Sequence, residues 1–74
     1  MQRYDVVIIG CGPAGLQAAV HAVRKKASVL VLGRAEASSL YWAHVENYLC
    51  VDGVVEGKTL IETGMAQAKR FGAE

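Results

Sequence analysis

The 74-residue sequence lacks several features that mark common classes of protein. It contains only 2 cysteines, Cys11 and Cys50, and these form neither a CxxC pair nor part of a metal-ligand cluster. An excess of charge of one sign is also missing, because 8 lysines and arginines balance 7 aspartates and glutamates for a net charge of +1. We therefore expect two ordinary reduced thiols and no binding to nucleic acid or to a membrane surface.

Long hydrophobic runs are absent as well. Apolar runs such as residues 6–9 are far too short to cross a bilayer, and residues 1–4 do not introduce a signal peptide. We therefore expect no membrane segment and a cytoplasmic location. The length allows at most one domain with a small core, since chains of this size bury roughly 60% of their unfolded surface.

Glycine is concentrated in the most informative part of the chain, residues 5–34. The apolar run at residues 6–9 leads directly into the sequence GCGPAG. In a dinucleotide-binding turn, Gly10 makes the tight turn, Gly12 lets a pyrophosphate approach the backbone, and Gly15 lets a helix pack against the strand. Pro13 suits the first turn of that helix, whose free N–H groups and dipole would face the phosphates. Glycines that serve only the packing of the strand against the helix are the simpler alternative.

A helix and a second strand follow this turn at the spacing that the motif requires. Apolar residues recur at i, i+3, i+4 and i+7 on one helix face: Leu16, Ala19, Val20 and Val23. The apolar run at residues 29–32 then predicts a second strand, parallel to the first through a right-handed crossover. The sequence therefore predicts an α/β fold with a Rossmann-like βαβ unit.

The rest of the chain predicts one further helix after a long connection. Residues 35–56 show no sustained periodicity, and their aromatic side chains are equally compatible with covering a sheet edge and with approaching an aromatic ligand. A helix is expected from about residue 58 to 71, with Gly72 as a left-handed cap and with Gly64 placed against a close neighbour. Its expected apolar face consists of Leu60, Ile61, Met65, Ala68 and Phe71.

Two parallel strands do not make a complete sheet. Parallel strands with continuous apolar runs need both faces covered and neighbours on their edges. We therefore expect residues 1–74 to be an incomplete part of a larger parallel-sheet domain, or a chain that folds against a partner. A third strand would be expected directly after the last helix.

Three stretches resemble the N-terminal part of the thioredoxin reductase family of FAD-dependent pyridine nucleotide-disulfide oxidoreductases. They are DVVIIGCGPAGLQAA (residues 5–19), VENY (residues 45–48) and AKRFGAE (residues 68–74). The first stretch is shared by many flavoproteins, whereas the other two at this distance are more specific. The resemblance implies a FAD domain built from N- and C-terminal segments, an inserted NADPH domain that carries the redox CxxC, and a homodimer.

The resemblance also implies the residues that bind the cofactor. Those implied to hold the FAD pyrophosphate are Gly10, Gly12, Pro13, Ala14 and Gly15. Asn47, within VENY, is implied to reach the flavin end, and no residue of the chain is a convincing catalytic acid, base or nucleophile.

Three departures from the family pattern bear on the ligand. Gly33 and Arg34 stand where the family usually has an acidic residue that binds the adenosine ribose, so a glutamate at position 33 is expected to strengthen FAD binding. The sequence ASSL (residues 37–40) replaces Gly-Gly-Gln-Leu, and Leu49-Cys50 replaces the proline after VENY.

The sequence therefore supports three readings. The first is the FAD-binding segment of a flavoprotein that passes electrons from NAD(P)H through flavin to an unknown acceptor. The second is an NADP-binding Rossmann module, because Arg34 would meet a 2′-phosphate. The third is a non-catalytic fragment that folds against a partner chain.

Overall fold

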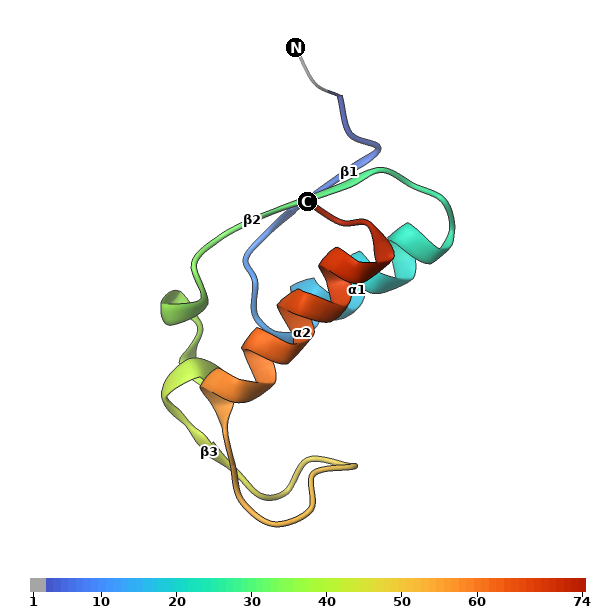
Figure 1. The fold of residues 1–74 in the computed structure, drawn as a ribbon. Helices are drawn as coiled ribbons and strands as arrows, with labels where there is room; N and C mark the ends of the chain where they lie inside the picture. The colour runs from blue at the N-terminus through green and yellow to red at the C-terminus, as the bar shows by residue number, and fades with distance from the viewer. Residues whose placement is uncertain (1–2) are drawn as a thin grey trace.

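The predicted βαβ unit and the further helix are both present in the structure, a computed structural model that describes residues 3–74 (Figure 1). Met1 and Gln2, part of the stretch expected not to introduce a signal peptide, lie outside the described residues. The chain runs through β1 (Val6–Ile9), α1 (Pro13–Arg24), β2 (Val29–Leu32) and, after a long connection, α2 (Gly57–Phe71). These bounds confirm the predicted strands and place the start of α2 one residue before the predicted start.

The two strands pair in parallel, as their apolar runs predicted. Val6 lies opposite Val29, and the register continues to Ile9 opposite Leu32. Both helices cover the same face of this sheet and pack against each other (Figure 1). Side chains of Val6 and Ile8 reach the helices, whereas Val7 and Ile9 point to the opposite face, because strand side chains alternate.

The core lies between the sheet and the two helices. Its buried apolar side chains are Cys11, Leu16, Ala19, Val20, Val29, Ile61, Ala68 and Ala73. The predicted face of α1 is confirmed, with Val23 packed at its margin. Phe71 was expected on the core face of α2, but it is 40% exposed and its ring lies 5.2 Å from the Arg70 guanidinium carbon. Ala73, beyond the end of the helix, is buried instead.

Gly72 ends α2 as predicted. Its φ of 116° is left-handed, a conformation that favours glycine. The Gly72 N–H donates to the carbonyl of Lys69 at 2.9 Å, and the Ala73 N–H donates to that of Ala68 at 3.0 Å. This pair of bonds is a Schellman motif, which satisfies carbonyl groups at the helix end and turns the chain back toward the sheet.

The long connection is more ordered than its sequence indicated. It contains two short 3-10 helices, η1 (Ala35–Ala37) and η2 (Ser39–Trp42), and two antiparallel two-residue strands, β3 (His44–Val45) and β4 (Val55–Glu56). The strands pair His44 with Glu56 and Val45 with Val55, and they close a loop of residues 46–54 that extends away from the helices (Figure 1).

The last residue of the chain pairs with the edge of β2 that β1 leaves free. The Glu74 N–H donates to the Val29 carbonyl at 3.0 Å, and the Val31 N–H donates to the Glu74 carbonyl at 2.7 Å. These two bonds have the pattern of a parallel ladder, so Glu74 lies where the predicted third strand would begin. Among the described residues, no helix is long and apolar enough to cross a membrane.

Candidate functional site

The glycine turn joins the end of β1 to the start of α1 and lies beside the end of β2. The Gly10 N–H donates to the Leu32 carbonyl at 2.6 Å, which continues the sheet pairing into the turn. Gly10 has a φ of 105°, so the chain leaves the strand in a conformation that glycine adopts without strain. This geometry supports the tight turn that the sequence predicted.

Gly15 brings α1 close to the strand that precedes it. A side-chain carbon at this position would overlap the Gly10 carbonyl oxygen and would lie 3.2 Å from the Ile8 side chain. The role predicted for Gly15, close packing of helix against strand, is therefore confirmed.

Gly33 permits a second close approach, between the end of β2 and the turn. A side-chain carbon here would lie 3.0 Å from the Cys11 nitrogen and 3.2 Å from the Gly10 α-carbon. The structure thus gives position 33 a packing reason to be glycine. A glutamate there would press on the turn, so the expected gain in FAD binding from this substitution no longer follows.

The N-terminus of α1 is suited to bind an anion. Gly12 is the N-cap and Pro13 begins the helix; within residues 3–74 no side chain caps this end, and its first turn has no acidic residue. Pro13 and Ala14 are exposed. The free N–H groups and the positive end of the helix dipole are therefore open to a negatively charged group such as a phosphate.

Ser38 faces Gly12 from the far side of the turn. A side-chain carbon at position 12 would lie 3.2 Å from the Ser38 hydroxyl oxygen. Sequence reasoning named residues 37–40 only as a departure from the family pattern and did not place Ser38 at the turn. No periodicity of the connection predicted the 3-10 turns that bring it there.

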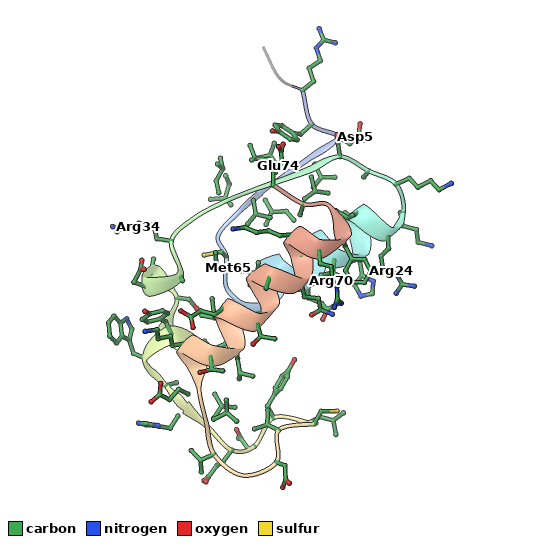
Figure 2. The ribbon with its side chains drawn as sticks, in the orientation of Figure 1. Asp5, Arg24, Arg34, Met65, Arg70 and Glu74 are labelled. Atoms are coloured by element: carbon green, nitrogen blue, oxygen red, sulfur yellow. The ribbon has the colours of Figure 1, made fainter. Side chains whose placement is uncertain are left out.

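Arg34 directly follows Gly33, the residue after β2 that contacts the glycine turn. Its side chain is exposed, and Figure 2 shows it pointing away from both helices. Gly33 lies against Gly10 and Cys11, and Ser38 lies against Gly12, so these two residues border the glycine turn.

Asn47 belongs to a different part of the molecule, the exposed loop at residues 46–54. Its neighbour Tyr48 lines a hollow of about 370 Å³, which Pro13, Leu16 and Gly64 also line. The structure therefore brings the VENY loop and the glycine turn to the same hollow, although Asn47 itself does not line it. Gly64 has the close neighbour that was predicted, since a side-chain carbon there would lie 3.2 Å from Leu16.

The described residues do not form a metal centre. No group of three or more histidine, cysteine, aspartate or glutamate side chains within residues 3–74 is placed to hold a metal ion. Cys11 is buried in the turn and Cys50 is exposed in the loop, and both are free thiols. The site is therefore built from backbone N–H groups, one hydroxyl and one guanidinium group.

Comparison with known proteins identifies the family. The family model for pyridine nucleotide-disulphide oxidoreductases matches residues 4–73. The thioredoxin reductase of Aquifex aeolicus is 47% identical over 73 residues, which cover 96% of this chain and 23% of that protein. The chain thus spans about a quarter of the length of the relatives that it matches.

Solved structures agree with this result. The thioredoxin reductase of Gloeobacter violaceus superimposes with a TM-score of 0.89 at 35% identity, covering 95% of this chain and 23% of that one. A ferredoxin-flavin thioredoxin reductase from Clostridium acetobutylicum gives a TM-score of 0.78 at 39% identity, covering 100% of this chain and 26% of that one.

The parallel β1–α1–β2 unit, the glycine turn and α2 match the N-terminal part of these reductases in order and in arrangement. The family to which they belong depends on FAD. This chain belongs to the pyridine nucleotide-disulphide oxidoreductase family and is homologous to the N-terminal FAD-binding region of thioredoxin reductases.

Proposed function

We propose that this chain is the FAD-binding segment of a thioredoxin reductase-like flavoprotein that passes electrons from NAD(P)H through flavin to an acceptor. The observation that carries the proposal is the uncapped N-terminus of α1, where Ser38 is the only described residue, apart from the chain neighbours of Gly12, within 4 Å of the space that a side chain at position 12 would fill. A diphosphate placed there would accept hydrogen bonds from backbone N–H groups and would lie at the positive end of the helix dipole.

The segment's share of the mechanism is to bind and orient the cofactor. The residues that would hold its pyrophosphate are Gly10, Gly12, Pro13, Ala14 and Gly15. Gly33 and Arg34 would lie toward the adenosine end, and Asn47 toward the flavin end. Bound FAD supplies the electron-transfer chemistry, and the described residues add no acid, base or nucleophile to it. We expect residues 1–74 alone to be inactive.

Arg34 supports one alternative, a module that binds NADP. A guanidinium group after the second strand of a Rossmann unit pairs with a 2′-phosphate, which FAD lacks. Arg34 is exposed and stands where the acidic ribose ligand usually lies. Substitution of this residue therefore distinguishes the two ligands.

The test measures FAD and NADP affinities of the native-length protein, stripped of flavin, with Arg34 and with Arg34→Ala. FAD binding is expected to persist with little change in the variant. A loss of NADP affinity by about tenfold to a hundredfold, without an effect on FAD, would instead support the NADP module. Arg24→Ala, an exposed arginine at the other end of α1, is the matched control.

The electron donor needs a separate measurement. NAD(P)H is proposed from the family, but the Clostridium acetobutylicum relative is a ferredoxin-flavin thioredoxin reductase. Anaerobic bleaching of the flavin absorbance by NADPH or NADH is the expected result. Bleaching by reduced ferredoxin alone would still support FAD as the cofactor, but would make ferredoxin the electron donor in place of NAD(P)H.

The remaining proposals concern the state of the whole protein. We propose a homodimer located in the cytoplasm, in which residues 1–74 form the N-terminal part of a FAD-binding domain. A purified native-length protein that binds no FAD and is stable only with a second polypeptide would favour the non-catalytic fragment instead.

A further inference from the structure

Two backbone hydrogen bonds hold Ser38 in the connection after β2. Its N–H donates to the Ala35 carbonyl at 3.1 Å, and its carbonyl accepts from the Tyr41 N–H at 3.1 Å. The first bond closes η1 and the second opens η2, so two short helical turns fix the residue between them. This backbone sets the position of the Ser38 β-carbon, and the side chain is half-buried next to Gly12.

The hydroxyl group of Ser38 stabilises the connection itself. Its oxygen accepts a hydrogen bond from the Leu40 N–H at 3.3 Å, which caps η2. A serine hydroxyl also carries one proton to donate, and among the described residues the bond from the Leu40 N–H is the only one at this hydroxyl. The proton is therefore available to a group outside residues 3–74.

The hydroxyl lies at the mouth of the anion-binding turn. A side-chain carbon added to Gly12 would lie 3.2 Å from the Ser38 oxygen and 3.8 Å from its β-carbon. Gly12 is the N-cap of α1, so the hydroxyl borders the same end of the helix as the free N–H groups. A phosphate drawn to those groups would meet the Ser38 proton from the opposite side.

We propose that Ser38 is a further ligand of the cofactor and donates its hydroxyl proton to a phosphate oxygen of FAD. The proposal rests on the proposed FAD function of the turn. It assigns to this side chain a contact that a glycine, which the resemblance implies at this position, does not make.

The experiment uses the native-length protein stripped of flavin and four variants. Ser38→Ala and Ser38→Gly remove the hydroxyl, and Ser38→Thr keeps it. Ser39→Ala is the matched control, because Ser39 is exposed and neighbours Ser38 in the chain. Affinity for FAD is measured by flavin fluorescence, and ADP and adenosine are measured as competitors, since only ADP carries the diphosphate.

The expected result is a loss of FAD and ADP affinity by about tenfold or more in Ser38→Ala and Ser38→Gly, the size of one hydrogen bond to a charged group. The adenosine affinity should stay unchanged in every variant. The FAD and ADP affinities of Ser38→Thr and Ser39→Ala should stay close to those of the unsubstituted protein.

Three results would overturn the proposal. Unchanged FAD and ADP affinities would show that the hydroxyl does not contact the phosphate. Tighter binding by Ser38→Gly would show that the side chain obstructs the site. An equal loss for adenosine would assign the effect to the cap on Leu40. A failure of the unsubstituted protein to bind FAD would instead overturn the proposed function itself, together with everything built on it.

Discussion

At the scale of single residues, the glycines of this chain differ in what surrounds them. A side-chain carbon at Gly57 would overlap the backbone carbonyl of Leu40, whereas one at Gly64 would meet only the Leu16 side chain, its Cδ1 atom at 3.2 Å. Backbone cannot move aside as a flexible side chain can. Gly57 therefore fixes where η2 crosses the start of α2, and Gly64 only adjusts the packing of α2 on α1.

Gly57→Ala is expected to destabilise the protein by about 3 kcal/mol, because η2 must move away from α2. Gly64→Ala is the control within the same helix. It should change stability by no more than about 1 kcal/mol, since the helix gains from alanine what the contact with Leu16 costs. Urea unfolding of the native-length protein, followed by circular dichroism, measures both. Equal effects of the two substitutions would contradict the distinction.

At the scale of elements, hydrophobic periodicity and glycine chemistry were enough to predict β1, α1, β2 and α2. Each has an apolar pattern over a full element, and glycines follow β1, β2 and α2, although α1 ends at its C-cap Lys25 without one. The pairing of β3 with β4 could not be predicted, because two residues are too few to show alternation. Phe71 was placed on the core face by spacing alone, but the chain turns at Gly72 and Ala73 fills that space.

The residues of the candidate site also differ in whether the sequence alone could predict their contacts. The turn at residues 10–15 has a local sequence signature, and Gly15 has the close neighbours that this signature implies, Gly10 and Ile8. The contact of Gly33 with Cys11 and that of Ser38 with Gly12 join residues more than 20 positions apart. Such contacts depend on how β2 and the connection pack, which a single sequence does not reveal without a model of the fold.

Tyr4, near the start of the described residues, is joined to Glu74 by a side-chain hydrogen bond. The Tyr4 hydroxyl donates to the carboxylate of Glu74, the residue labelled at the end of the chain in Figure 2. This bond, together with partial burial and the negative charge of Glu74, raises the pKa of the Tyr4 hydroxyl above its ordinary value of 10.0. The bond therefore helps to hold Glu74 against β2 only while Tyr4 keeps its proton.

The sign of the pH dependence follows from this raised pKa. A group with a higher pKa in the folded state contributes its stability below its unfolded pKa, near 10, and loses that contribution as the pH rises through the folded value. Tyr4→Phe should therefore be less stable than the unsubstituted protein between pH 8 and 9, where the bond is intact, and should lose less stability as the pH rises further. Unfolding midpoints between about pH 8 and pH 11 test this, with the tyrosinate absorbance followed in parallel. An identical alkaline profile in Tyr4→Phe would show that other groups dominate.

At the scale of the whole molecule, one face of the sheet has no cover within residues 3–74. The helices lie on the other face, and large apolar side chains remain exposed on this one: Val7 is 51% exposed, Ile9 79% and Leu32 47%. The register places Ile9 directly beside Leu32, so these side chains form a continuous apolar surface. Such a surface, next to the free edge of β1, is a site of association.

The isolated chain of residues 1–74 is therefore expected to self-associate and to retain FAD weakly or not at all. Replacing Val7, Ile9 and Leu32 with threonine keeps residues that suit strands but removes much of the apolar surface. This triple variant should weaken self-association by about tenfold or more, measured by sedimentation velocity over a range of concentrations.

Leu49→Thr with Val54→Thr is the matched control for this variant, because both residues are exposed, at 86% and 62%, but lie in the loop between β3 and β4. If the sheet face drives association, the control should sediment like the unsubstituted chain. Equal weakening by both sets of substitutions would indicate non-specific contacts. A monomer of residues 1–74 that keeps stoichiometric yellow cofactor would contradict the prediction altogether, since it would mean that this sheet needs no further strands to bind FAD.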